Sequence, residues 1–403
     1  MRRARASHAA VTAGAIAVLA CGSGSATSAL PASNTCEASS SYEALFVASD
    51  YTSSAVGALS LDGAAPLMKT GADLGGDPAL SVSLPTHRAF YVARDQDAVF
   101  ELERCTGVPI AKWHVGEPAH RGSANPQDVA VAADGSLWIA RYNVSSIAIV
   151  DPRGAPMRTL DLSRFDGDGN PNASAIRIAD GKAFVMLERV DDSDGLKSKQ
   201  PSSVVRIDTA SASVEAEIVL EGRNPFGVTE HDGALWLSEP GNFDALDEPL
   251  AGIERFDLAA STSRLVVREH DLGGSVAEVA ITDGCGAAIV ADATSLNATS
   301  LVLFDPASGA VLTPASRPLF ATPGFSLQGL AWLTDARGER VLVVGDRGPR
   351  DPRGYAVHVF EPVADAAGGS GGSGSSGGRQ CTLRMRPDAL FIGQKPVAIH
   401  ARL

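Results

Sequence analysis

The sequence predicts an all-β fold, a seven-bladed β-propeller closed by a C-terminal strand that joins the N-terminal blade. A five-residue pattern (three apolar residues, a small one and a polar one) occurs seven times. Its copies are Leu45–Ser49, Phe90–Arg94, Leu137–Arg141, Phe184–Glu188, Leu235–Glu239, Ala288–Asp292 and Leu342–Asp346. They begin 45 to 54 residues apart, a period typical of four-stranded propeller blades. The pattern indicates a strand that is buried on both faces and emerges at one rim.

A second pattern, apolar-x-x-apolar-acid, follows every copy of the first. Its copies are Ala58–Asp62, Val99–Glu103, Ile147–Asp151, Val204–Asp208, Ile253–Asp257, Leu301–Asp305 and Val357–Glu361. The acid ends a strand and opens a turn. Asp-Gly pairs, such as Asp134-Gly135, precede four copies of the first pattern and predict tight hairpins. Each repeat therefore predicts four strands, A to D, with the first pattern as strand B and the second as strand C.

The strands A indicate how the propeller closes. Six of them begin near Ala79, Gln127, Ala175, Phe226, Val276 and Leu327. None precedes Leu45, but Pro396–Ile399 resembles Pro126–Val129 and Pro225–Val228. The C-terminus is therefore predicted to supply strand A of the first blade, which removes the last open sheet edge.

The composition is that of a folded globular protein. The chain has 403 residues, of which 44% are hydrophobic and 20% charged. A net charge of -13 without a basic run argues against nucleic-acid binding. No Gly-x-Ser-x-Gly, phosphate-loop or His-Glu-x-x-His motif is present. We expect a monomer without a cofactor, unless a divalent cation such as calcium binds.

The first 41 residues are predicted to lie outside the fold. Residues 1–20 contain three arginines and then an apolar run too short to span a bilayer, as in a signal peptide. The run ends Val18-Leu-Ala-Cys21, which resembles the bacterial lipoprotein signal and predicts lipidation of Cys21. The alternative is ordinary secretion with cleavage further on, for example after Ser28. Residues 21–41 are predicted to form a flexible tether, and 42–403 the propeller.

The remaining four cysteines, Cys36, Cys105, Cys285 and Cys381, form an even set in an exported chain. They allow three pairings, among which the sequence does not choose. Residues 368–378 are almost purely Gly and Ser. We interpret them as an insertion in the last blade, with 381–393 returning as strand D; a detached tail is the alternative.

Binding function is expected on the face that carries the long B-to-C loops, at residues 189–201, 240–249 and 347–353. Alternatively, these surface loops are long because their length is not constrained by any function. Charged residues at strand ends are predicted to surround the channel mouth on this face and to bind a small zwitterionic or carbohydrate ligand. They are Arg94, Arg141, Glu188, Glu239, Asp292, Asp346, Asp128 and Glu278. Alternatively, these charges pair with one another across blades.

Asp166, Asp168 and Asn170 alternate as the ligands of a calcium loop do. Pro171 and Arg177 depart from the EF-hand pattern, so a polar turn is the alternative. If Asp191, Asp192 or Asp194 folded over this loop, calcium binding would be favoured.

Several motifs carry a family resemblance. Tyr91–Arg94, Trp138–Arg141 and Ile147–Asp151 resemble the repeats of the bacterial YncE-like, YVTN-repeat propellers. Further stretches are similar to a set of propeller lipoproteins of myxobacteria and related bacteria: Asp50–Ser54, Asn125–Asp128, Asp161–Asp166 and Gly252–Asp257. The resemblance implies a propeller anchored in the cell envelope, on the periplasmic side or at the cell surface. It implies no particular activity.

Two classes of function remain open. The first is a binding or interaction module of the envelope, whose partner is an envelope protein, a glycan or a small molecule. The second is a divalent-cation-dependent hydrolase similar to lactonase propellers, with Glu188, Glu239, Asp292 and Asn297 as candidate ligands of the cation.

Overall fold

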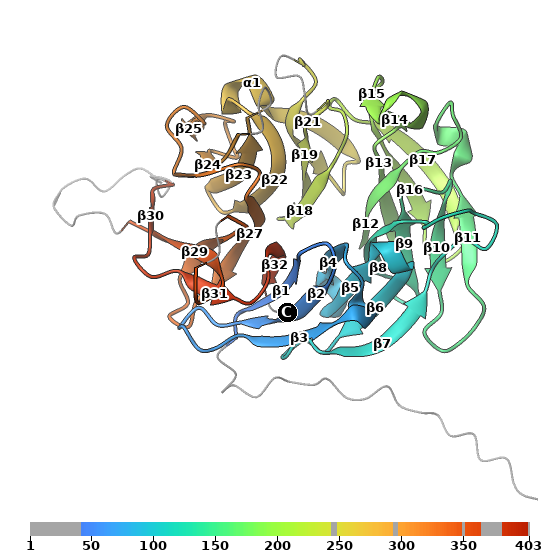
Figure 1. Ribbon diagram of the computed structural model, residues 1–403. Helices are drawn as coiled ribbons and strands as arrows, with labels where there is room; N and C mark the ends of the chain where they lie inside the picture. The colour runs from blue at the N-terminus through green and yellow to red at the C-terminus, as the bar shows by residue number, and fades with distance from the viewer. Residues whose placement is uncertain (1–41, 243–247, 293–296, 349–350, 364–380, 402–403) are drawn as a thin grey trace, which may run out of the picture. The chain divides into compact units, whose positions relative to one another are not determined.

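Seven antiparallel sheets stand around a common centre, so the predicted fold class is confirmed (Figure 1). The computed structural model describes residues 42–242, 248–292, 297–348, 351–363 and 381–401. From the innermost strand outward, blade one contains β32 (Pro396–Ala401), β1 (Ala44–Ser49), β2 (Ser54–Leu59) and β3 (Leu67–Gly71). Blade two contains β4 (Pro78–Ser83), β5 (Arg88–Ala93), β6 (Ala98–Leu102) and β7 (Pro109–His114). Blade three contains β8 (Pro126–Val131), β9 (Leu137–Arg141), β10 (Ser146–Val150) and β11 (Arg158–Asp161).

The later blades carry additions to this plan. Blade four contains β12 (Ala173–Ala179), β13 (Lys182–Leu187), β16 (Ser203–Asp208) and β17 (Ser213–Val219), and its B-to-C loop holds the hairpin β14 (Val190–Asp191) and β15 (Lys197–Ser198). Blade five contains β18 (Gly227–His231), β19 (Ala234–Glu239), β20 (Gly252–Asp257) and β21 (Thr262–Arg268). The short helix α1 (Glu269–Leu272) leads into blade six.

The outer edges of the last two blades are each made by two short strands. Blade six contains β22 (Ser275–Thr282), β23 (Cys285–Ala291) and β24 (Ala298–Phe304), with β25 (Val311–Thr313) and β26 (Phe320–Pro323) both paired to β24. Blade seven contains β27 (Leu327–Thr334), β28 (Arg340–Asp346) and β29 (Tyr355–Pro362), with β30 (Leu383–Met385) and β31 (Leu390–Ile392) both paired to β29. The chain thus returns to blade seven after residue 380.

The second strand of each blade is almost entirely buried. Every side chain of β9 is buried, because its two faces pack against the neighbouring blades. The Asp-Gly pairs form the A-to-B turns as expected: Asp180 and Gly181 both have positive φ, 48° and 73°, and so do Asp232 and Gly233. Two adjacent residues of this conformation give a hairpin turn that matches the twist of the strands.

The two ends of the propeller meet in blade one. β32 pairs antiparallel with β1, from Ala44 opposite Ala401 to Val47 opposite Ala398. Figure 1 shows the two strands side by side. Ile399 is 2% exposed and belongs to the same core cluster as Phe46. The C-terminal strand therefore completes the first sheet, as the sequence predicts.

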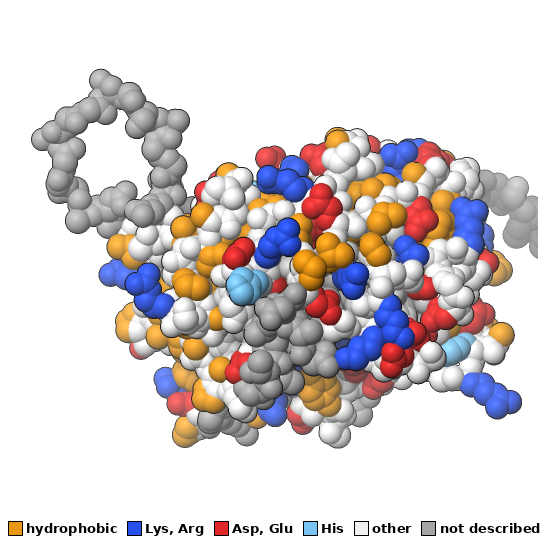
Figure 2. Space-filling view, turned by 90° about the horizontal axis from the view of Figure 1, so that it is seen from above, with side chains coloured by type: hydrophobic (Ala, Val, Ile, Leu, Met, Phe, Trp, Pro, Cys, Tyr) orange, Lys and Arg blue, Asp and Glu red, His pale blue; other side chains and the backbone are white. Residues whose placement is uncertain are grey.

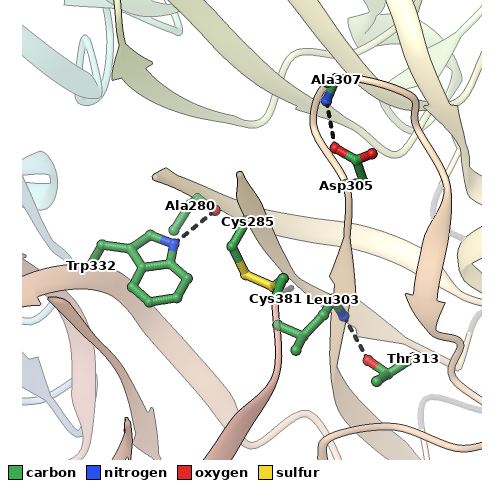
Figure 3. The surroundings of a disulfide bond; sticks show 8 residues. All are labelled: Ala280, Cys285, Leu303, Asp305, Ala307, Thr313, Trp332 and Cys381. Atoms are coloured by element: carbon green, nitrogen blue, oxygen red, sulfur yellow. Dashed lines mark hydrogen bonds between the residues drawn. A yellow bond between two sulfur atoms is a disulfide. The ribbon is translucent and has the colours of Figure 1, made fainter. Parts of the chain in front are cut away.

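One disulfide links the last two blades. Cys285 on β23 is bonded to Cys381, 96 residues later, with their Cα atoms 5.2 Å apart (Figure 3). Nearby, the Trp332 indole donates to the Ala280 carbonyl at 3.3 Å, a second link between blades six and seven. This bond belongs to one of the three pairings that the sequence left open; Cys36 lies outside the described residues.

The surface carries mixed charge. On the side shown in Figure 2, basic, acidic and hydrophobic side chains are interspersed. Within the described ranges, no helix is long and apolar enough to cross a membrane.

Candidate functional site

A central cavity of about 840 Å³ opens at the face formed by the B-to-C and D-to-A loops. The innermost strand of every blade lines it: β4, β8, β12, β18, β22, β27 and β32. Leu196 and Asn242 come from the two long loops of blades four and five and also line it. A volume between about 300 and 1,000 Å³ is usual for small-molecule sites.

Two of the predicted channel residues, Arg94 and Glu188, lie in the cavity wall with a partner each. Arg94 forms an ion pair with Asp77 at 3.3 Å. The Tyr142 hydroxyl donates a hydrogen bond of 2.6 Å to the Glu188 carboxyl group. Burial raises the pKa of Glu188 to about 8, although the Tyr142 hydrogen bond and the Arg94 charge act in the opposite direction. Glu188 is therefore protonated at neutral pH.

Asp128 also lies in the cavity wall, where it connects neighbouring blades. From β8 it accepts a hydrogen bond of 3.0 Å from the Ile176 backbone N–H, and it pairs with Arg177 on β12. His400, on β32, lies in the same part of the wall. Burial and the nearby Arg177 lower the pKa of His400 to about 4, so the imidazole is neutral at pH 7.

Glu278 makes the corresponding link between blades six and seven. From β22 it accepts hydrogen bonds from the backbone N–H groups of Gly329 at 3.0 Å and Leu330 at 2.8 Å, both on β27. Burial raises its pKa to about 7. A carboxylate that receives backbone donors is a well-satisfied structural group, and it still presents an edge to the cavity.

Arg141 and Glu239 lie away from the cavity, in the spaces between blades. Arg141 is fully buried and donates to the Val115 carbonyl and to Glu117, both at 3.1 Å. Glu239 is also fully buried, and burial together with Glu254 raises its pKa. These residues end strands B, whose side chains alternate between the two faces of a blade rather than pointing toward the axis. The predicted ring of charged residues at the channel mouth is therefore incomplete.

Asp346 and Asp292 do not line the cavity either. The Asp346 carboxylate accepts a hydrogen bond of 2.7 Å from the Gly348 N–H and lies 3.4 Å from His358 Nε2. Asp292 and Asn297 flank residues 293–296, which lie outside the described ranges. Of the four candidate hydrolase ligands, only Glu188 faces the cavity.

The predicted calcium loop lies beside the cavity, at the entrance to blade four. Asp166 Oδ1 accepts a hydrogen bond of 3.0 Å from Gln200, and exposed Asp168 accepts one of 2.8 Å from the Asn170 backbone N–H. Asp192 folds over the loop and accepts a hydrogen bond from the Asn170 amide at 2.8 Å. Among the described residues, no group of three or more His, Cys, Asp or Glu side chains is placed to hold a metal.

An apolar rim lies at the cavity mouth, on blades one, four, five and seven, and was not predicted from the sequence. We define it as Tyr51, Leu196, Phe226 and Phe325. These side chains are 40 to 63% exposed, although they are large and apolar. Phe226 and Phe325 stand in D-to-A loops, just ahead of inner strands, and this position is the signal in the sequence that could have revealed them. Exposed apolar side chains gathered at a cavity indicate a binding surface.

The fold and the site define the class: a seven-bladed β-propeller with a central cavity of mixed polar and apolar lining and an apolar rim. No protein-family model matches the chain. No curated protein matches it either. Among solved structures, it is similar to dihydro-heme d1 dehydrogenase NirN in complex with DHE, with a TM-score of 0.50, 15% identity, and coverage of 92% of this chain and 77% of that one.

Two lyase structures give lower scores. For virginiamycin B lyase from Staphylococcus aureus with quinupristin, the TM-score is 0.44 and the identity 12%, covering 76% of this chain and 92% of that one. For a streptogramin B lyase the TM-score is 0.44 and the identity 13%, covering 75% of this chain and 90% of that one. At 15% identity, the similarity to dihydro-heme d1 dehydrogenase NirN concerns the fold alone.

Proposed function

We propose that the protein is a lipid-anchored binding module of the bacterial cell envelope that holds a small neutral glycan in its central cavity. The observation that carries this proposal is the apolar rim around a wall whose charged groups are already paired. Aromatic side chains such as Phe226 and Phe325 stack on the apolar face of a sugar ring, as they do on other flat apolar surfaces. The paired groups below them present both donors and acceptors, which is what a hydroxyl group needs, because it donates and accepts at once.

The pairing of charges favours binding over cation-dependent hydrolysis. Arg94 is paired with Asp77, Arg177 with Asp128, and Glu188 is bonded to Tyr142. The two arginines are balanced by carboxylates and Glu188 is neutral, so these groups offer no unbalanced charge to a charged ligand. A hydrolase of the lactonase type requires several oxygen ligands that converge on one cation, and three of the four candidate residues do not face the cavity.

Calorimetry with neutral oligosaccharides released from bacterial envelopes tests the binding proposal. Phe226→Ala and Phe325→Ala should each weaken binding about 5-fold, because stacking on one aromatic ring contributes about 1 kcal/mol. Val219→Ala is the matched control, since Val219 is 57% exposed on the outer strand of blade four, where it takes no part in the cavity. Unchanged affinity in both Phe variants, or binding of charged ligands only, would refute the proposal.

The anchor is proposed from the signal-like segment and the lipoprotein resemblance at Cys21, which lies outside the described residues. Expressed in a bacterium with lipoprotein processing, the chain should incorporate a labelled fatty acid and sediment with membranes. Cys21→Ser should abolish the label and release the chain into the soluble fraction. A Cys21→Ser chain that stays labelled and membrane-bound would exclude this anchor.

A further inference from the structure

A second cavity, of about 320 Å³, lies between blades five and six. Strands β19, β20 and β21 line one side of it, and the turns that follow β22 and β24 line the other. These turns join strands A to B and C to D, so the cavity is on the face of the propeller opposite the central cavity mouth. The two cavities share no residue, and glycan binding in the first is independent of what the second contains.

Two arginines stand side by side in the second cavity. Arg255 on β20 and Arg264 on β21 are directly opposite each other in the antiparallel register. Their side chains therefore leave the same face of the sheet, with Cβ atoms about 5 Å apart. On the other side of Arg255, the register places Trp236 of β19, and all three residues line the cavity. Like charges directly opposite each other destabilise a sheet, so the arginine pair lowers stability unless an anion lies between the two.

The chain itself supplies a carboxylate to only one of these arginines. Asp257 Oδ2 accepts hydrogen bonds from both terminal nitrogens of Arg255, each at 3.3 Å. The Arg264 guanidinium forms no hydrogen bond or ion pair with any described residue. One of the two positive charges in the cavity is therefore not compensated.

Two acids at the edge of the cavity do not change this balance. The Asp283 side chain is 99% exposed and lies 3.1 Å from His231 Nε2, and Asp232 is exposed as well. Carboxylates this exposed are surrounded by water of high dielectric constant, so they offset a nearby guanidinium only weakly.

The arginine pair has the chemistry of a phosphate site. A guanidinium group donates two parallel hydrogen bonds to a carboxylate or a phosphate. A carboxylate has one pair of oxygens for one such fork, whereas a phosphate has enough oxygens to accept from two guanidinium groups at once. The volume of the cavity is at the lower end of the range for small-molecule sites, about 300 to 1,000 Å³, so a phosphate ester fits with part of the group attached to it.

We propose that Arg255 and Arg264 bind a phosphate group between blades five and six. Phospholipid headgroups are one source of such a group. Tyr42, at the start of the described chain, lies on the same face, because its hydroxyl donates to the Ala65 carbonyl in the C-to-D turn of blade one at 3.1 Å. The lipid anchor proposed at Cys21 would bring headgroups to this face, so the lipid source rests on that proposal. A soluble phosphate ester is the other source and requires no anchor.

Calorimetry and thermal unfolding of the purified full chain test the site, in sodium phosphate and in sodium chloride of equal ionic strength. Inorganic phosphate should bind with a dissociation constant of about 1 mM. At about 10 mM it should raise the melting temperature by at least about 1 °C relative to chloride. Arg264→Gln should weaken phosphate binding at least about 10-fold, because it removes one of the two guanidinium groups. Without phosphate and at low salt, this variant should melt at or above the wild-type temperature, because the like-charge pair is gone.

Arg158→Gln is the matched control. Arg158 is also exposed on an outer strand, β11, but it stands opposite Ile149 and lies outside the cavity. This variant should bind phosphate as the wild type does. Arg264→Lys keeps the charge but not the planar fork, so its affinity for phosphate should fall between those of Arg264→Gln and the wild type.

Flotation with lipid vesicles distinguishes the two sources. The Cys21→Ser chain is mixed with vesicles of phosphatidylcholine alone or with about 30% phosphatidylglycerol, an anionic phospholipid. Flotation that needs both phosphatidylglycerol and Arg264 assigns the site to lipid headgroups, and binding of inorganic phosphate without flotation assigns it to a soluble ester. The proposal fails if neither probe binds, if Arg264→Gln binds both probes as the wild type does, or if Arg158→Gln loses as much affinity as Arg264→Gln.

Discussion

Replacing Ile399 with Ala should measure how much the C-terminal strand stabilises the propeller. The side chain is 2% exposed and packs in a cluster with Phe46 and Leu333. Three carbon atoms are removed, and at about 0.8 kcal/mol each the lost transfer free energy is about 2.4 kcal/mol. The cavity left in a close-packed site raises the expected loss to about 3–4 kcal/mol, within the range for Ile→Ala substitutions.

The assay is urea unfolding of the full chain, followed by far-ultraviolet circular dichroism. Ile399→Ala should lower the free energy of unfolding by this amount, whereas Val219→Ala, which removes an exposed β-branched side chain from β17, should change it by less than about 0.5 kcal/mol. A loss of less than about 1 kcal/mol for Ile399→Ala would refute the reasoning, because it would mean that β32 does not pack in blade one in solution. An equal loss in both variants would do the same.

Three further predictions follow from buried groups. Burial gives Glu188 a folded-state pKa of about 8, against an ordinary glutamate pKa of 4.5. Its contribution to stability is therefore complete below about pH 4.5 and is lost as the pH rises toward 8. Glu188→Gln should flatten the fall in melting temperature between pH 5 and 8, and an unchanged slope would contradict the assignment. Replacing Cys285 and Cys381 together with Ser should lower the free energy of unfolding by about 2–5 kcal/mol, measured by urea unfolding under oxidising conditions; a double variant as stable as the wild type would show that the bond does not form. Gly222→Ala should lower the free energy of unfolding by about 1–3 kcal/mol, because its new methyl group would overlap the Glu239 carboxylate. A variant with the melting temperature of the wild type would show that the Glu239 side chain moves aside freely.

The fold was predictable because several independent patterns in the repeat predict the same strands. Strands B and C recur in register seven times, and the absence of a strand A before Leu45 together with the Pro396–Ile399 segment predicts the closure that β32 makes. Hydrophobic period and turn residues are local properties, so they can be identified without knowledge of the tertiary structure.

The site was only partly predictable. Arg94, Asp128, Glu188 and Glu278 do line the cavity, but equal positions in the repeat do not lead to equal surroundings. Arg141 ends its strand in the same column as Arg94, yet it is buried between blades because Val115 and Glu117 of the preceding loop offer it acceptors there. Such partners come from loops that differ in length and sequence from blade to blade, so the repeat pattern contains no information about them.

The way the last blade resumes at Thr382 has a practical consequence. The Val363 backbone N–H donates to the Thr382 carbonyl at 3.0 Å, and Cys381 is fastened to blade six. Residues 364–380 thus join two points that the sheet already holds together. Lengthening such a connection adds only about 0.6 kcal/mol for each doubling of its length. A foreign peptide or a small domain with adjacent termini could accordingly be displayed between these points, with the propeller serving as its carrier.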